Sequence, residues 1–128
     1  MSGALLDTSV VIAAQGSVGE LPRSAAISVV TLGELHAGVF LARTEPARQL
    51  RQARLDALRT AFSPIPVDEI VAERYGAVVA VARDEGRAAK ATGVLIIATA
   101  AATSRTLVTR DLAQARLARA AGIPVTES

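Results

Sequence analysis

Near its N-terminus the chain reads Ala4-Leu5-Leu6-Asp7-Thr8-Ser9-Val10-Val11-Ile12, an apolar run broken by one carboxylate and two hydroxyls. Such a run is typical of a buried strand in a parallel sheet, and the polar trio predicts where the strand ends and a helix begins. In open α/β sheets, ligands bind at this end of the strands. The same short polar side chains also cap the first turn of a helix, and the two roles are compatible.

The composition indicates a folded protein without disulfides or thiolate metal sites. The chain has 128 residues, of which 51% are hydrophobic and 20% are charged, and it contains no cysteine. We expect a single domain over residues 1–128 with one sizeable core. The apolar stretches are too short or too interrupted to span a bilayer, and no basic segment precedes Leu5. These features predict a soluble, cytoplasmic protein with no membrane partner.

Strands and helices are predicted to alternate along the whole chain. The expected strands cover residues 4–6, 25–30, 63–67, 105–109 and 123–125, with a loop over residues 16–23. The expected helices cover residues 8–14, 31–42, 45–62, 68–84, 92–102 and 112–120. This alternation favours an α/β fold with a mainly parallel central sheet.

The helix expected over residues 45–62 has Pro46 in its first turn. Its predicted buried stripe consists of Leu50, Ala53, Ala57 and Ala61. An arginine row on another side either contacts phosphates or forms a solvated face with ion pairs; it consists of Arg48, Arg51 and Arg59. The net charge of only +2 does not by itself establish nucleic-acid binding. The three aromatic residues are expected at buried or half-buried positions: Phe40, Phe62 and Tyr75.

Three carboxylates follow predicted strands. Asp7 and Asp111 each end a strand, and Glu34 lies in the first turn after the strand over residues 25–30. Parallel strands with right-handed crossovers place these positions at one edge of the sheet. Carboxylates that converge there repel one another unless a cation lies among them, and an all-oxygen donor set favours Mg²⁺ or Mn²⁺. Alternatively, Thr31 and Glu34 have the spacing of a capping box, while His36 is interpreted as a surface or partner-facing residue.

Four segments together resemble a known family. They are Leu6-Asp7-Thr8-Ser9, Ser28-Val29-Val30-Thr31-Leu32-Gly33-Glu34-Leu35, Leu95-Ile96-Ile97-Ala98-Thr99-Ala100 and Thr106-Leu107-Val108-Thr109-Arg110-Asp111. In this order and at this spacing the chain resembles the PIN-domain ribonucleases, and among them the VapC toxins of type II toxin-antitoxin pairs. The resemblance implies a three-layer α/β/α fold that binds Mg²⁺ or Mn²⁺ and cuts RNA phosphodiesters. The family's first, second and last acids correspond to Asp7, Glu34 and Asp111, which are thereby implied as metal-binding and catalytic residues.

The resemblance also implies partners. They are a cognate antitoxin, whose C-terminal segment would occupy the acidic groove, an RNA substrate, and a second copy of the chain in a homodimer. A small receiver-like or nucleotide-binding α/β domain is the alternative outside the family. That class needs a lysine or a glycine-rich phosphate loop at the same edge, and the sequence shows neither there.

One position departs from the family pattern. The family has an aspartate six residues before the threonine that corresponds to Thr99, and here that position is Gly93. Glycine supplies no metal ligand and is a poorer helix opener than aspartate, whether it is a natural replacement or an introduced one. The prediction is a metal site that is weakened rather than abolished. The function is then either a magnesium-dependent endoribonuclease toxin attenuated by Gly93 or a catalytically silent PIN domain that binds an antitoxin.

Overall fold

A parallel sheet forms the centre of the molecule. The computed structural model describes residues 3–14, 20–22 and 24–128. Within them, strands β1 (Ala4–Leu6), β2 (Thr106–Thr109) and β3 (Val125–Glu127) pair in the order β1-β2-β3, all parallel. Leu6 lies opposite Val108, so the two strand ends that precede the predicted site are adjacent. The predicted α/β class with a parallel sheet is confirmed.

The prediction of a strand over residues 25–30 is wrong, because this segment does not form a regular strand. This segment makes only isolated parallel bridges, from Ala26 to Leu5 and from Ser28 to Ile65. It is cut short because the next helix begins at Val29, within the apolar run that suggested a longer strand. Residues 63–67 likewise contribute one bridge, and the last strand begins at Val125 rather than ending there. The loop predicted over residues 16–23 lies mostly outside the described residues.

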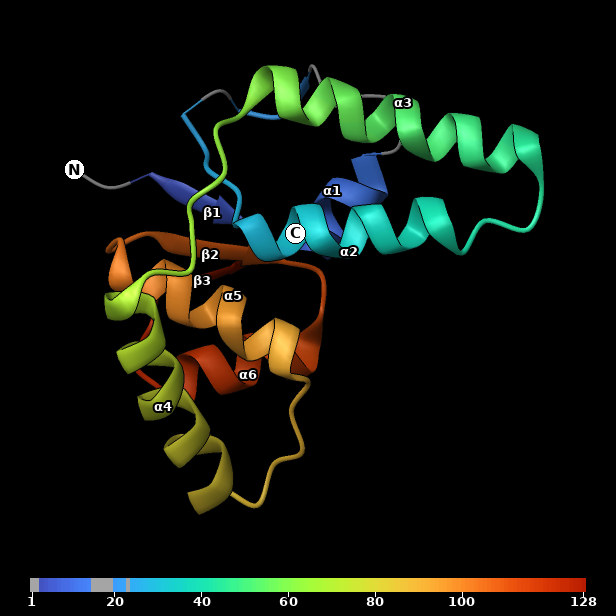
Figure 1. Cartoon of the computed structure of the whole chain (residues 1–128). Coiled ribbons are helices and arrows are strands. Elements are labelled where there is room, and N and C mark those ends of the chain that lie inside the picture. Colours follow the sequence, from blue (N-terminus) through green and yellow to red (C-terminus); the bar gives the residue numbers. More distant parts are fainter. Residues whose placement is uncertain (1–2, 15–19, 23) are drawn as a thin grey trace.

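Helices cover both faces of the sheet. They are α1 (Thr8–Ala14), α2 (Val29–Phe40), α3 (Glu45–Ala61), α4 (Glu69–Asp84), α5 (Ala91–Ala102) and α6 (Leu112–Ala120). Figure 1 shows α3 on one side of the sheet and α4 and α6 on the other. No helix in the part of the chain that the structure describes is both long enough and apolar enough to cross a membrane.

Two apolar cores result from the alternation of side chains along the strands. Leu5 and Leu107 point into a core with α4, α5 and α6. Leu6 points into a second core with α1, α2 and α3, against which Val108 is packed. One sheet between two helical layers is the three-layer α/β/α arrangement expected of the family.

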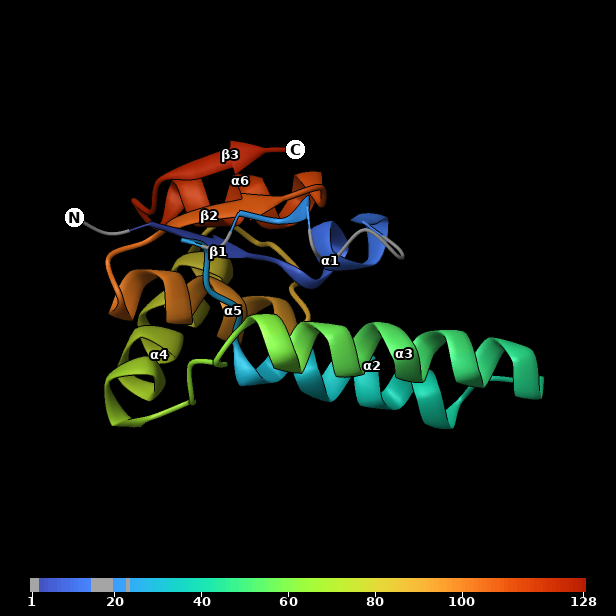
Figure 2. The same ribbon diagram turned by 90° about the horizontal axis from the view of Figure 1, so that it is seen from above.

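Helices α2 and α3 run side by side and extend beyond the sheet (Figure 2). The guanidinium of Arg51 on α3 donates a hydrogen bond to the carbonyl oxygen of Gly38 on α2 at 2.6 Å. Arg51 therefore joins two helices and is not part of a free arginine row. Arg48 pairs with Glu45 at 2.6 Å on the exposed surface, and its hydrogen bond holds the pKa of the Glu45 carboxyl below its usual value.

Two predictions for side-chain burial fail in this pair of helices. The buried residues of α3 are Leu55 and Leu58, whereas Leu50 is 74% exposed. Phe40 at the end of α2 is 84% exposed, and Leu41 beside it is 76% exposed. The helical period fits more than one stripe in an alanine-rich helix, and the packing partner selects between them.

Candidate functional site

One pocket contains all three predicted acids. It has a volume of about 570 Å³, lies at the carboxyl ends of β1 and β2, and is lined by Asp7, Glu34 and Asp111. Gly93, in the first turn of α5, lines the same pocket. The elements that carry these four residues are separated in sequence and are brought together by the parallel sheet.

Asp7 lies directly between β1 and α1, and its residue is only 6% exposed. Its backbone N–H donates to the carbonyl oxygen of Val108 at 2.9 Å, which fixes it beside the end of β2. Its Oδ2 accepts hydrogen bonds from the backbone N–H of Ser9 at 3.1 Å and from the Ser9 hydroxyl at 2.5 Å. Asp7 therefore bonds to the first turn of α1 and also faces the pocket, so both roles considered from the sequence are combined.

Asp111 has the equivalent position after β2. It is the N-cap of α6, where its Oδ1 accepts the backbone N–H of Gln114 at 3.1 Å. A negative side chain at this position also interacts favourably with the positive end of the helix dipole. Asp111 is exposed at the mouth of the pocket, whereas Asp7 is buried.

Glu34 reaches the pocket from α2 and does not form the capping box. The N-cap of α2 is Ser28, whose hydroxyl accepts the backbone N–H of Val30 at 3.0 Å. Thr31 is fully buried inside the helix, with its hydroxyl 2.9 Å from that of Thr8. Thr8 donates its single hydroxyl proton to Glu34 Oε1 at 2.6 Å, so the Thr31 hydroxyl donates to Thr8. This chain of hydrogen bonds anchors the Glu34 carboxylate beside the residue that follows Asp7.

Gln114 is a site residue that sequence reasoning missed. Its side-chain amide donates to Asp7 Oδ1 at 3.0 Å and to the carbonyl oxygen of Gly93 at 3.3 Å. Its Oε1 accepts the hydroxyl proton of Thr109 at 2.6 Å. The spacing Asp111–Gln114 is itself a helix-start signal that could have drawn attention to the residue. That signal would have assigned its side chain to capping, whereas the side chain bridges two other elements.

Comparison with known proteins identifies the family. The PIN domain matches residues 4–120 of this chain. The chain belongs to the PIN-domain family. It is 43% identical over 100 residues to Ribonuclease VapC8 of Mycobacterium tuberculosis, covering 75% of this chain and 88% of that protein. It is 31% identical over 125 residues to Ribonuclease VapC5 of the same organism, covering 94% of this chain and 92% of that protein.

A solved structure extends the likeness to the whole PIN domain. VapBC-5 of Mycobacterium tuberculosis, a member of the VapBC family of toxin-antitoxin systems, superposes with a TM-score of 0.86 and 30% identity. The match covers 100% of both chains. FitAcB from Neisseria gonorrhoeae has a TM-score of 0.77 and 28% identity, with 95% of each chain covered.

The donor atoms of this PIN domain fit a divalent metal ion of the magnesium type. The acids that line the pocket offer only carboxylate oxygens, and Mg²⁺ is commonly held by one or two protein carboxylates together with waters. Among the residues that the structure describes, no three acidic, histidine or cysteine side chains form a group that could hold a metal ion. Asp7, Glu34 and Asp111 thus share the pocket without forming such a three-ligand group.

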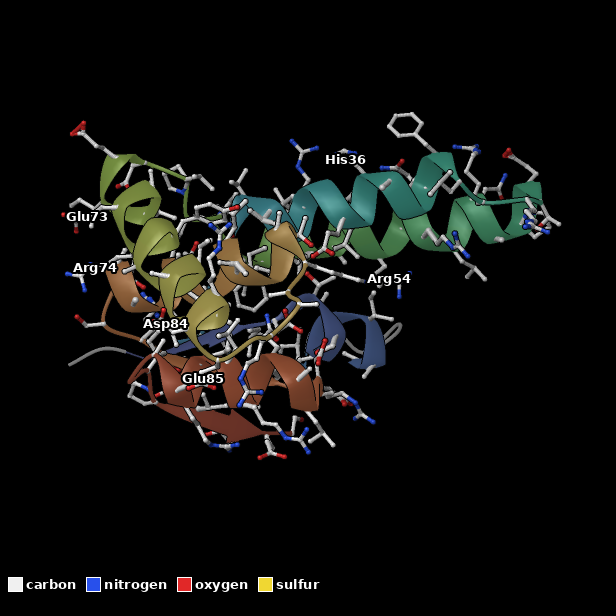
Figure 3. All side chains as sticks on the ribbon, turned by 90° about the horizontal axis from the view of Figure 1, so that it is seen from below. His36, Arg54, Glu73, Arg74, Asp84 and Glu85 are labelled. Carbon is white, nitrogen blue, oxygen red and sulfur yellow. The ribbon has the colours of Figure 1, made fainter. Side chains whose placement is uncertain are left out.

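Two cationic side chains of the PIN domain line the same pocket. Lys90 is the N-cap residue of α5, and Arg87 lies three residues before it. Arg87 forms an ion pair with Glu85 at 2.6 Å. His36 lies on the outer side of α2 (Figure 3) and is half-buried. The pocket thus combines acids at its sheet edge with positive charge on the segment before α5.

Proposed function

We propose that this PIN domain is a magnesium-dependent endoribonuclease toxin of a type II toxin-antitoxin system, attenuated by Gly93. The observation that carries the proposal is the single pocket lined by Asp7, Glu34 and Asp111. It is supported by membership of a family in which two relatives at 43% and 31% identity are named ribonucleases. The proposal keeps the cytoplasmic location and the Mg²⁺ or Mn²⁺ cofactor expected from the sequence.

The residues of the pocket have separate roles in this proposal. Asp7 and Asp111 hold the metal ion, and Glu34, fixed by Thr8, holds the ion or a water molecule beside it. When bound, the ion supplies positive charge for the phosphodiester that is attacked. Lys90 and Arg87, which line the same pocket, orient the anionic RNA backbone by charge.

The proposed partners follow from the relatives and from the surface. A cognate antitoxin would insert its C-terminal segment into the acidic groove, where a basic side chain pairs with the carboxylates. The end of the α2–α3 pair exposes Phe40, Leu41 and Leu50, each 74–84% exposed. Exposed apolar residues of this size favour contact with another protein, either the antitoxin or the second copy in a homodimer.

A second candidate function is a catalytically silent PIN domain that binds an antitoxin. Two observations favour it. Gly93 supplies no carboxylate, and the side chain of Gln114 already donates to Asp7 Oδ1. In this case the protein keeps the PIN fold and the acidic groove that binds the antitoxin, but it does not cleave RNA.

Cleavage of a mixed RNA pool tests the proposal. The parent chain, Gly93→Asp, and Gly93→Asp with Asp7→Asn are compared in Mg²⁺ or Mn²⁺ and in EDTA. We expect weak cleavage by the parent, steeply higher cleavage by Gly93→Asp, and loss of cleavage on adding Asp7→Asn, because asparagine keeps the shape but lacks the charge that holds the ion.

The matched control is Asp56→Asn, which makes the same change on the exposed surface of α3. Added to Gly93→Asp, it should leave cleavage intact. Cleavage that persists in EDTA or with Asp7→Asn contradicts the metal-dependent function. If Gly93→Asp cleaves RNA and the parent chain does not, the parent chain is the catalytically silent PIN domain that binds an antitoxin.

A further inference from the structure

The orientation of the Gln114 side chain is fixed by its neighbours. The residue lies in the first turn of α6 and is only 9% exposed. Asp7 Oδ1 and the carbonyl oxygen of Gly93 accept hydrogen bonds and have no hydrogen to donate, so the amide nitrogen must face them. The amide oxygen correspondingly faces the hydroxyl of Thr109. Every polar atom of the side chain is engaged.

Gln114 occupies the oxygen of Asp7 that has room for a cation. Oδ2 already accepts two hydrogen bonds from Ser9, one from the backbone and one from the hydroxyl. Two donors use both lone pairs of a carboxylate oxygen. Oδ1 is therefore the atom through which Asp7 can bind a metal ion, and the Gln114 amide lies 3.0 Å from it.

The same amide faces position 93, where the family pattern has an aspartate and this chain has glycine. A Cβ atom added at Gly93 would lie 3.7 Å from Gln114 Nε2, in ordinary van der Waals contact. A carboxylate built on that Cβ is within reach of the amide hydrogens. The NH₂ group thus lies between Asp7 and position 93, where it satisfies two oxygen acceptors without a net charge.

We propose that Gln114 is a positioning residue that occupies, with its amide group, space between Asp7 and position 93 that a divalent cation needs. It holds this edge of the pocket together in the metal-free protein and competes with metal binding. Gly93 and Gln114 then both weaken metal binding. Gly93 supplies no carboxylate ligand, and the Gln114 amide occupies Asp7 Oδ1. The inference rests on the proposed metal-dependent function.

Substitution of Gln114 by methionine tests this competition. Gln114→Met retains a side chain of similar length and removes the amide hydrogens. It is made in the parent and in Gly93→Asp, and Mn²⁺ is titrated into each protein by calorimetry. We expect Mn²⁺ affinity to rise about tenfold or more in both backgrounds, the factor that corresponds to releasing one hydrogen bond to a charged group. The metal-free melting temperature should fall, because Asp7 Oδ1 and the Gly93 carbonyl lose their donor.

The matched control is Gln52→Met on α3, where the glutamine amide donates to Asp56 Oδ1 at 2.9 Å on the exposed surface. This control should leave Mn²⁺ affinity unchanged. A purely structural role for Gln114 would lower the melting temperature without raising the affinity, and that result overturns the proposal. Weaker Mn²⁺ binding overturns it also, since it would mean that Gln114 prepares Asp7 for the metal.

The failure of the proposed function gives a different result. If Gly93→Asp binds no Mn²⁺ with either residue at position 114, the metal-dependent function is contradicted, and the inference falls with it. If Gly93→Asp binds Mn²⁺ and Gln114→Met adds nothing, the inference alone is contradicted. Should Gln114→Met fail to fold, Gln114→Leu provides the same comparison with a neutral side chain of similar size. It also lacks the amide donor and should bind Mn²⁺ more tightly than the parent, and weaker binding overturns the inference.

Discussion

At the scale of single residues, hydroxyl groups rather than charged pairs organise the acids. Thr8 connects Thr31 to Glu34, and Ser9 donates twice to Asp7. A carboxylate fixed by neutral donors keeps its negative charge available to a cation, whereas one paired with arginine does not. The sequence identified the acids, and Ser9 lies only two positions from Asp7. It did not predict the contacts of Thr8 with Thr31 and Glu34, because these bonds join residues more than 20 positions apart.

Thr8→Val tests this organisation. The change removes both the donor to Glu34 and the acceptor of the fully buried Thr31 hydroxyl. We expect the free energy of unfolding to fall by about 1–3 kcal/mol, the usual cost of an unsatisfied buried polar group. Urea denaturation measures this loss.

Thr60→Val is the matched control, since Thr60 donates to the carbonyl oxygen of Asp56 on the exposed surface of α3. Its effect should be smaller than that of Thr8→Val. If the two substitutions lowered the free energy of unfolding equally, the buried chain of hydroxyl groups would contribute no more to stability than an exposed hydroxyl does.

At the scale of elements, the ends of β1 and β2 were predictable from the sequence, whereas the start of α2 was not. The polar residues that follow β1 and β2 did lie at the pocket, because a buried apolar run has few ways to end. The start of α2 was misplaced, since Ser28 and Thr31 both qualify as caps and only the packed structure shows that Thr31 is buried. In α3 the alanine-rich pattern predicted the wrong buried stripe for the same reason.

Arg51→Ala tests the connection between α2 and α3. The Arg51 guanidinium donates to the Gly38 carbonyl oxygen across the two helices. We expect a loss of about 1.5–3 kcal/mol in unfolding free energy, as for one hydrogen bond from a charged donor. Chemical denaturation followed by circular dichroism measures it.

Arg48→Ala is the control on the same helix, because Arg48 pairs with Glu45 in solvent. This surface pair should change stability little. Since the pKa of Glu45 is lowered in the folded protein, its small contribution is present above the usual pKa of glutamate and is lost as the pH falls. An Arg48→Ala loss as large as that of Arg51→Ala would contradict the assigned role of Arg51.

At the scale of the whole molecule, the sheet places four separated segments around one pocket, so the metal binding proposed there would be coupled to folding. The layered fold was predictable from the alternation of strands and helices. The role of Gln114 was not, because the amide reaches an acid 107 positions away in sequence. A site assembled from different segments is stabilised as a unit by any ligand that binds only the folded state.

Thermal unfolding in Mn²⁺ tests this coupling. A ligand at one hundred times its dissociation constant stabilises the folded state by about 2.7 kcal/mol. We expect Mn²⁺ to raise the melting temperature of Gly93→Asp more than that of the parent at the same concentration. A larger rise for the parent would be opposite to the expected order of affinities.

We infer that position 93 lacks one carboxylate of a divalent metal site. Calorimetric titration of Mn²⁺ into the parent chain and into Gly93→Asp measures this directly. Two opposite unit charges about 4 Å apart interact by about 4 kcal/mol at an effective dielectric constant of about 20, so an added carboxylate should strengthen binding strongly. We expect measurable Mn²⁺ binding by both proteins, at least about tenfold tighter for Gly93→Asp. Equal affinities for the two proteins would contradict this inference.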